Sequence, residues 1–534
     1  MVRSKAETWK YSSTSTVKKC NVSPAEVLMD RATAALRLKL HAAASTSGAS
    51  RLECAAGLLH LAYVAPPHSQ APLSCARRAP SRNGMRTWSV ALMQQRAGGI
   101  VTVFGILLIV GLTLVPAGHH LLRPSLCLFC GRLSGTDAVL NVLLFAPVGL
   151  GLGILGMRPV RALGLMLLLT MSIEFLQLTI IPGREASLRD ILTNVVGGAA
   201  GLALGRRLPV VLVPGLRQAA ALLVVWSTGW LSIQTLGSLA SAPSFPHSLY
   251  YGQWQHHLRQ FDRFTGRLLE AEVDGKPMAD GPDPNLSPIG DVWRQHGSVR
   301  VRGVVLPGWE EPVRIAPIIS IFDGHRREIL LVGQWGSSLV FRVRSRASAA
   351  RFRSLLFGMD DVFPTSGIAP ADTALIIVEL QRGFARLATS QRGSTHQRVR
   401  RIGPGLTWCY AMPFDLALGT ATSIGALLWL FCGVAPLGYW SWFASRRNTG
   451  SAPSGGRATA LIVLTTAVAS MALWLVPYAA GTASGNAPEC VATAGGIAAG
   501  WFGACILARR WSRPRLSPQQ YCGANASPGN DHSG

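Results

Sequence analysis

Charged residues are scarce in this chain of 534 residues, and acidic residues are the scarcer kind. Charged residues make up 14% of the chain, with 51 Lys and Arg against 26 Asp and Glu, and the mean hydropathy is +0.29. So little charge is unusual for a soluble protein. Several apolar runs approach or exceed the roughly 20 residues that cross a bilayer as a helix. The composition therefore predicts a multi-pass membrane protein.

The chain also lacks a nucleic-acid-binding motif, although its net charge is +25. Its arginines form short runs beside apolar segments, such as Arg206-Arg207, Arg446-Arg447 and Arg509-Arg510. Membrane proteins place cationic residues in this way on the cytoplasmic side of the bilayer. We therefore expect the membrane lipid bilayer to be the partner of the basic residues, and we expect no nucleic acid.

The N-terminal 85 residues do not follow the pattern of a secretory signal peptide. Residues 1–85 are basic and rich in Ser and Ala, without a charged start that leads directly into an apolar run. We expect them to be either a disordered cytoplasmic tail or a segment upstream of the true start, for which Met85 is the candidate. The tail at 511–534 is likewise expected to be disordered and cytoplasmic.

Eight apolar segments are long enough to be membrane helices. More arginines lie in the short loops on the N-terminal side of the membrane than in those on the other side, which predicts that both termini are cytoplasmic. The segments group into a four-helix domain at 97–206, a fifth helix at 207–240 and three helices at 414–510. The spans are 98–116, 138–157, 161–181, 188–205, 218–239, 414–443, 458–480 and 489–508.

Residues 245–405 form a polar insert, which this orientation places outside the cytoplasm. Short runs rich in Val and Ile alternate with turn signals there, at 299–306, 313–322, 327–335, 338–345 and 374–380. The spacing predicts an antiparallel β-sandwich. The stretch SIFDGHRREILLVGQWGSSLVFRVRS (320–345) resembles the concanavalin-like (laminin-G-like) jelly-roll domains, many of which bind glycans. The expected fold is a multi-pass α-helical membrane protein with an all-β extracytoplasmic sandwich insert.

Ionisable and amide side chains recur at helical spacings at the edges of the second, third and fourth apolar segments. Spacings of three and four residues put each set on one face of its helix. Because such groups are costly in lipid, they normally face a partner or a wet cavity. The predicted orientation puts all three sets at the outer ends of their helices. The sets are Asp137 and Asn141; Glu174 and Gln177; and Ser187, Asp190 and Asn194.

We expect the three sets to form one polar, ligand-binding pocket that opens to the extracytoplasmic face. Pro182-Gly183 supplies a tight turn between the third and fourth helices, and Arg184 beside it is the candidate counter-charge for Glu174 or Asp190. Ser187 has the residue type and spacing of an N-cap followed by an acidic partner. In the alternative interpretation, the polar groups only hold the helices together through caps and interhelical hydrogen bonds.

The same residues resemble a known family. The segments DAVLNVLLFAPVGLGLG (137–153), EFLQL (174–178) and REASLRDILTNVVGGAAG (184–201) follow the pattern D-x3-N-x3-F-x-P-x-G, E-x2-Q and R-x2-S-x2-D-x3-N-x2-G-x3-G of the VanZ-like family. The resemblance covers residues 97–206. It implies an integral protein of the bacterial inner membrane, in a family whose founding member confers low-level teicoplanin resistance. No biochemical activity is settled for that family, and no cofactor is implied.

Cysteine and histidine give no strong sign of a metal site. Cys127 and Cys130 lie on the predicted oxidising side, where they could form a disulfide or remain thiols. A zinc site would need further ligands, for which only His119-His120 is nearby. We expect the insert's histidines, His256, His257 and His296, to be surface residues rather than ligands.

Three functions fit these patterns. An envelope protein would bind or process a lipid-linked or glycopeptide-type ligand at the outer leaflet, with Glu174 or Asp190 as acid or base and Arg184 as the anion partner. A transporter would need polar residues that continue toward the cytoplasm, or two related halves with broken helices; the inner halves are Leu, Val, Ala and Gly, and the last three helices do not repeat the polar motif. A non-enzymatic anchor or sensor would present a glycan-binding sandwich.

Overall fold

The computed structural model describes residues 82–114, 126–127, 133–181, 186–256, 258, 260–282, 286–363, 372–446 and 455–512. Eight helices of this described part are long and apolar enough to cross a membrane, which confirms the predicted multi-pass fold. Their spans are Met93–Thr113, Ser134–Ile154, Pro159–Thr179, Leu188–Leu212, Leu216–Ser241, Thr420–Ala444, Gly455–Ala480 and Ala487–Arg509.

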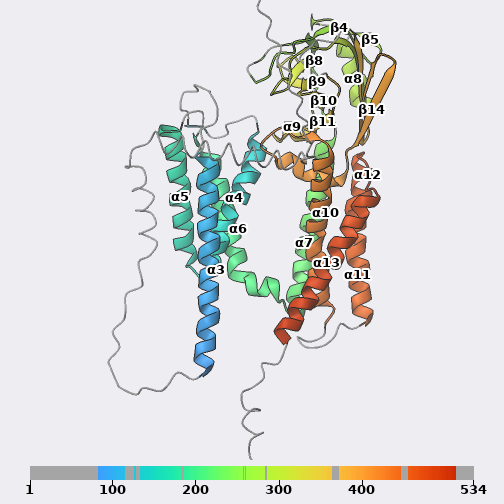
Figure 1. Ribbon diagram of the computed structural model, residues 1–534. Helices are drawn as coiled ribbons and strands as arrows, with labels where there is room; N and C mark the ends of the chain where they lie inside the picture. Colours follow the sequence, from blue (N-terminus) through green and yellow to red (C-terminus); the bar gives the residue numbers. More distant parts are fainter. Residues whose placement is uncertain are drawn as a thin grey trace, which may run out of the picture. The chain divides into compact units, whose positions relative to one another are not determined.

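The first four membrane helices form what we call the first bundle (Figure 1). Within it, α4 and α6 run parallel with their backbones almost in contact. A Cβ atom on Gly149 of α4 would lie 1.9 Å from the carbonyl O of Gly198 in α6, so no larger residue fits there. Small residues allow this approach between membrane helices. The helices are α3 (Arg82–Thr113), α4 (Ser134–Ile154), α5 (Pro159–Thr179) and α6 (Leu188–Leu212).

The remaining membrane helices form the second bundle, in which α10 and α13 are again parallel neighbours. Its third span contains a π-helical turn just before Pro477. Proline has no N–H to bond the carbonyl of Leu473, and that carbonyl accepts the N–H of Gly485 at 2.7 Å instead. The helices are α7 (Leu216–Ser241), α10 (Thr420–Ala444), α11 (Gly455–Ser470), η3 (Met471–Leu475), α12 (Val476–Ala480) and α13 (Ala487–Ser512).

The insert between α7 and α10 is built from two β-sheets whose inner faces share one core. A Cβ atom on Gly303 of one sheet would lie 2.9 Å from Cδ1 of Ile319 in the other, and buried residues of both sheets form a single cluster. The seven-stranded sheet has the order β15-β11-β10-β9-β8-β3-β6, and the six-stranded sheet has the order β14-β13-β12-β7-β4-β5. All pairs within these two sheets are antiparallel except β11 with β15.

The five strands predicted from sequence are confirmed as β7, β8, β9, β10 and β12. Between β8 and β9, Oδ1 of Asp323 accepts the N–H groups of His325 and Arg327 at 3.0 and 2.8 Å, which closes the predicted turn. The strands are β3 (Tyr250–Trp254), β4 (Arg267–Val273), β5 (Lys276–Pro277), β6 (Gly281–Pro282), β7 (Val299–Leu306), β8 (Ala316–Asp323), β9 (Glu328–Trp335), β10 (Ser338–Val343), β11 (Leu356–Met359), β12 (Ala374–Gln381), β13 (Phe384–Gln391), β14 (Ser394–Arg401) and β15 (Ala417–Leu418).

Three helical segments in the insert were not predicted. The 11-residue helix α8 (Leu286–His296) buries Trp293 in the core, and the indole Nε1 donates to Oδ2 of Asp274 at 2.5 Å. A short helix, α9 (Arg346–Ala349), lies between β10 and β11, and a 3-10 helix, η2 (Pro404–Ala411), follows β14. Of the histidines, His296 is exposed as expected, whereas the ring of His256 is half-buried against Phe261 and Phe322. His257 lies outside the described residues.

The insert contacts the start of α4. The N–H of Gly135 donates to the carbonyl O of Arg351 at 3.1 Å, and Oγ1 of Thr136 donates to the carbonyl O of Tyr410 at 3.0 Å. The hydroxyls of Tyr410 and Ser241 share a hydrogen bond of 2.6 Å, and burial raises the pKa of the phenol, which therefore stays protonated. The first turn of α4, whose N–H groups lack helical partners, is thus bonded to the base of the insert.

Candidate functional site

All the predicted polar sets that the structure describes lie at one end of the first bundle. We call this the polar end: α3 and α5 finish there, and α4 and α6 begin there. Successive membrane spans alternate in direction, so α7 also ends, and α10 begins, on this side of the membrane. The insert therefore stands on the same side as the polar end, as the sequence predicts.

The carboxylate of Glu174 joins α5 to the start of α6. Its Oε2 accepts the backbone N–H of Ser187 at 2.9 Å, and the two residues are only 7% and 3% exposed. Ser187 occupies the N-cap position of α6, as expected, but its side chain makes no capping hydrogen bond. Glu174 therefore accepts the N–H that the acidic residue of a capping box, here Asp190, would accept. Among the described residues, no cation pairs with Glu174.

One turn deeper, Asn194 of α6 bonds to α5. Its Nδ2 donates to Oγ1 of Thr170 at 2.8 Å, and both residues are buried. The sequence interpretation missed Thr170, although it lies four residues before Glu174 and therefore on the same face of α5. The oxygen Oδ1 of Asn194 and the hydroxyl of Ser187 are buried without a partner among the described residues.

The other side chains of α5 and α6 bond within the bundle. Nε2 of Gln177 donates to the carbonyl O of Thr113 at 3.1 Å, which supplies a partner to one of the unbonded carbonyls at the end of α3. Asp190 pairs with the adjacent Arg189 at 3.1 Å, while Nη1 of that arginine is buried without a described partner. The predicted counter-charge, Arg184, lies outside the described residues, so its role stays a prediction.

Asp137 and Asn141 belong to the first two turns of α4. Val142 lies against Gly197 of α6, because a Cβ atom on that glycine would be 2.2 Å from the carbonyl O of Val142. The two helices are parallel, so Asn141 and Asn194 differ in height by about 3 Å at the helical rise of about 1.5 Å per residue. Asn141 is half-buried and makes no hydrogen bond to the described residues.

A loop strand also reaches the polar end. The two-residue strand β1 (Leu126–Cys127) pairs in parallel with β2 (Ala186–Ser187), directly beside the Glu174 carboxylate. The backbone of the predicted CLFC segment therefore borders the site. Cys130 and the side chain of Cys127 lie outside the described part, so the disulfide stays a prediction. Within that part, no three His, Cys, Asp or Glu residues gather as metal ligands would.

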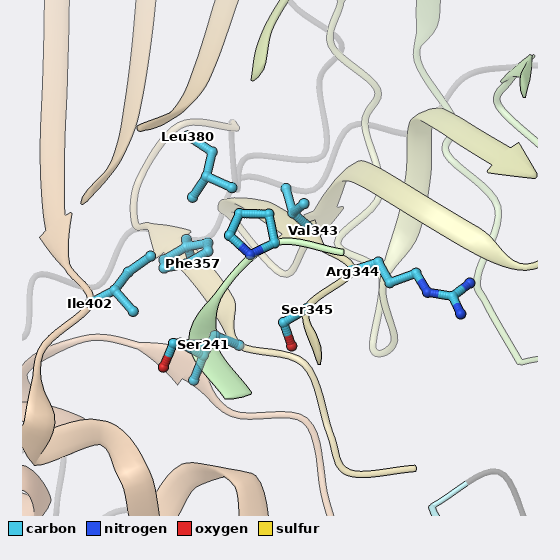
Figure 2. Close-up of a pocket in the computed structure, with 9 residues that line it drawn as sticks. Ser241, Val343, Arg344, Ser345, Phe357, Leu380 and Ile402 are labelled. Atoms are coloured by element: carbon cyan, nitrogen blue, oxygen red, sulfur yellow. The ribbon is translucent and has the colours of Figure 1, made fainter. Parts of the chain in front are cut away.

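In the described part of the chain, one hollow adjoins the start of α4. This open hollow of about 360 Å³ is lined by Ser134, where α4 begins, and by Ala349, Ala350 and Arg351 of the insert. A second hollow lies among apolar side chains of the sandwich, with Arg344 and Ser345 at its rim (Figure 2). Its volume of about 10 Å³ is about the space that one water needs. Only the first hollow has the size and position to extend the candidate site.

Comparison with known families agrees with this location. Residues 92–209 match the VanZ/LLP1 family model. The chain contains a VanZ-like domain. This domain covers the membrane-spanning part of α3, all of α4 and α5, and α6 up to Pro209, and it includes every predicted site residue. No curated protein and no solved structure matches the chain. The resemblance of the insert to laminin-G-like domains therefore stays a prediction.

Proposed function

We propose that the polar end of the VanZ-like domain binds a lipid-linked or glycopeptide-type ligand at the outer leaflet of the bacterial cell membrane. One observation supports this most: Ser187 Oγ and Asn194 Oδ1 are buried near the Glu174 carboxylate without a described partner. Buried polar atoms in folded proteins are nearly always hydrogen-bonded. Oxygen acceptors left open beside a carboxylate fit a ligand that carries N–H or O–H groups.

The proposed orientation comes from the arginine distribution, which puts the polar end and the insert outside the cytoplasm. The hollow lined by Ser134 and Arg351 would give such a ligand room between the VanZ-like domain and the insert. Arg351, which lines the hollow, and Arg189, at the start of α6, carry guanidinium groups that suit a phosphate or carboxylate. The insert would contact the glycan part of the ligand.

In a processing reaction, Glu174 or Asp190 would act as acid or base. Glu174 is held by the N–H of Ser187 through Oε2, which leaves Oε1 for a ligand. Asp190 is already paired with Arg189, so Glu174 is the better acid or base of the two. Arg184 would serve as the anion partner.

The test uses the full chain in two assays. The first is the teicoplanin susceptibility of a bacterial host that expresses it. The second is the thermal shift of the purified protein with teicoplanin and with a polyprenyl-diphosphate-linked disaccharide peptide. Glu174→Gln keeps an oxygen that can accept the N–H of Ser187, so the variant should fold and lose the ligand-dependent effects. Glu489→Gln is the matched control, because Oε2 of Glu489 accepts the N–H of Asn486 at 2.9 Å in the second bundle.

A Glu174→Gln, Asp190→Asn double variant sharpens the test. Wild-type ligand shifts from this variant, with wild-type susceptibility, would contradict the proposed binding role. The hydrogen bonds of Glu174, Gln177 and Asn194 within the bundle favour a second candidate, a non-enzymatic anchor that presents a glycan-binding sandwich. The anchor predicts that the full chain still binds envelope glycans when these polar side chains are replaced.

A further inference from the structure

The backbones of α4 and α6 meet in the same way as those of α10 and α13. A Cβ atom on Gly149 would lie 1.9 Å from the carbonyl O of Gly198. A Cβ atom on Gly438 of α10 would lie 1.9 Å from the carbonyl O of Ile497 in α13. Each bundle thus contains a parallel helix pair that a glycine of the first helix brings into backbone contact.

Two further contacts keep the same register. A Cβ atom on Gly201 would lie 2.0 Å from the carbonyl O of Ala146, and one on Gly500 would lie 1.9 Å from the carbonyl O of Ala435. A Cβ atom on Gly197 would lie 2.2 Å from the carbonyl O of Val142, and one on Gly496 would lie 2.4 Å from the carbonyl O of Phe431. In all three contacts, the residue numbers in α4 and α10 differ by the same amount. The residue numbers in α6 and α13 also differ by a constant amount. Close glycine packing is common in membranes, but a shared register over three contacts is a much stronger likeness.

The sequences agree at these positions. The segment Ala146-Pro147-Val148-Gly149 corresponds to Ala435-Pro436-Leu437-Gly438. On the partner helices, glycine occupies positions 197 and 201 in α6 and positions 496 and 500 in α13, with two alanines before the second glycine in both. The acidic residue and the small polar residue near the start of the helix also correspond: Asp190 with Glu489, and Asn194 with Thr493.

The order of the segments is the same in both bundles. In each, a helix leads to the polar-end side, a segment follows there, and three more spans complete the bundle. We infer that α7, α10, α11 with α12, and α13 form a second VanZ-like bundle, with the β-sandwich inserted between its first two helices. The family match at 92–209 does not include this part of the chain.

The second bundle differs from the first where α10 corresponds to the polar face of α4. Asp137 and Asn141 correspond to Ala426 and Leu430, which are 6% and 1% exposed. A segment of the chain itself, η2, covers this place. A Cβ atom on Gly405 of η2 would lie 2.8 Å from Cβ of Ala426 and 2.9 Å from Oε1 of Glu489.

The space that η2 occupies beside Ala426 and Glu489, which we call the seat of η2, has a counterpart in the VanZ-like domain. Ala426 and Glu489 correspond to Asp137 and Asp190, so the equivalent space lies between the outer turns of α4 and α6. This step rests on the proposed binding function: the ligand would occupy the space that the peptide segment η2 fills in the second bundle. A peptide backbone fits this space in the second bundle, so the ligand class is one with a peptide part.

A graft tests the second bundle without any ligand. Residues 489–500 of the full chain are replaced by the sequence of residues 190–201, either in register or shifted by one residue. In register, the glycines fall on positions 496 and 500, and the purified protein should keep a single monodisperse peak and a cooperative thermal transition. The shifted graft should lose both. Equal tolerance of the two grafts would overturn the inference.

If both grafts fail to fold, single substitutions decide. Gly500→Ala should lower the thermal midpoint as much as Gly201→Ala does, whereas Gly503→Ala faces open space and should leave it unchanged. A Gly500→Ala variant that is as stable as Gly503→Ala would overturn the shared register.

The seat of η2 is tested by thiol accessibility in a background without other reactive cysteines. Thr493→Cys should resist a water-soluble maleimide in the parent chain and in Gly403→Val, whose added Cβ makes only ordinary contacts of 3.4 Å or more. Gly405→Val should displace η2 and make the thiol reactive. If Gly405→Val unfolds, Gly405→Ala replaces it. If the thiol already reacts in the parent, or is equally protected in folded Gly405 and Gly403 variants, then η2 does not cover this part of the second bundle. Neither result depends on ligand binding.

Discussion

The two bundles share a helix register but differ in what lies at the ends of their paired helices. In the second bundle, Ala426 and Leu430 are buried, Ala426 under η2 and Leu430 in the core of the bundle. In the first bundle the same positions hold Asp137 and Asn141. Since α10 packs against α13 without polar groups there, the polar groups of α4 are not needed for the packing of α4 against α6. The difference separates the residues that hold the helices together from those that the proposed ligand would contact.

The starts of α6 and α13 show the same separation. In α13, Glu489 and Asn486 cap each other: the N–H of each bonds to the other's side chain, at 3.0 and 2.9 Å. This is the arrangement of a capping box. In α6, the N–H of Ser187 bonds to Glu174 from another helix instead, and Asp190 pairs with Arg189. The second bundle uses its acidic residue for the helix start, whereas the first bundle leaves Asp190 free of that role.

The largest expected effect comes from breaking the shared register. Gly149→Leu and Gly438→Leu each force a side chain against a backbone carbonyl 1.9 Å from the new Cβ. Overpacking typically costs about 1–3 kcal/mol and occasionally more, and here neither helix backbone can yield without separating the pair. Both variants should lose monodisperse protein in size-exclusion chromatography. Gly111→Leu, which meets nothing within 4 Å, should behave like the parent, and equal losses from all three would refute the packing argument.

A reciprocal exchange at the corresponding positions of α4 and α10 should give the next largest effect. Leu430→Asn buries an amide in an apolar core, at a cost of about 1–3 kcal/mol for the unpaired group. Asn141→Leu removes an amide that has no described partner, so it should be neutral or stabilising and should abolish the ligand-dependent shift. Thermal unfolding with and without teicoplanin measures both. Equal destabilisation by the two exchanges would mean that Asn141 is structural.

The smallest expected effect separates bonded from unbonded threonines. Thr170→Val removes the acceptor for Nδ2 of Asn194 and should cost about 1 kcal/mol. Thr493→Val removes a buried hydroxyl that has no described partner, so it should leave the stability unchanged or raise it slightly. The midpoints of chemical unfolding in mild detergent measure the difference. A larger loss from Thr493→Val than from Thr170→Val would reverse the assignment of the two sites.

Apolar length and β-periodicity were sufficient to predict the eight spans and five strands of the insert, because burial imposes those patterns directly. The polar end was also predictable, since Glu174, Ser187 and Asn194 stand out against apolar neighbours. The partners of these residues were not. Thr170 resembles a small filler residue in an apolar helix, and the bond from the Ser187 N–H to Glu174 rather than to Asp190 is set by tertiary packing.

The second bundle was not predictable from the motif that identifies the first. The polar residues of α4 carry much of the family resemblance, and α10 has lost them. What remains, an Ala-Pro-x-Gly segment and spaced glycines, is ordinary in membrane helices. Only the backbone contacts that these residues make show that the register is shared. The helix α8 was missed for a different reason, because a single amphipathic helix among short strands has no neighbouring pattern to support it.

The central claim is that the polar end of the VanZ-like domain holds a molecule other than the chain itself. An experimental density map of the full chain in a lipid nanodisc tests this most directly. If a ligand binds there, the map will contain density for a bound molecule within hydrogen-bonding distance of Ser187 Oγ and Asn194 Oδ1, between the first turns of α4 and α6. Side chains from residues 115–125 or 182–185 filling that space and bonding both oxygens would contradict the claim.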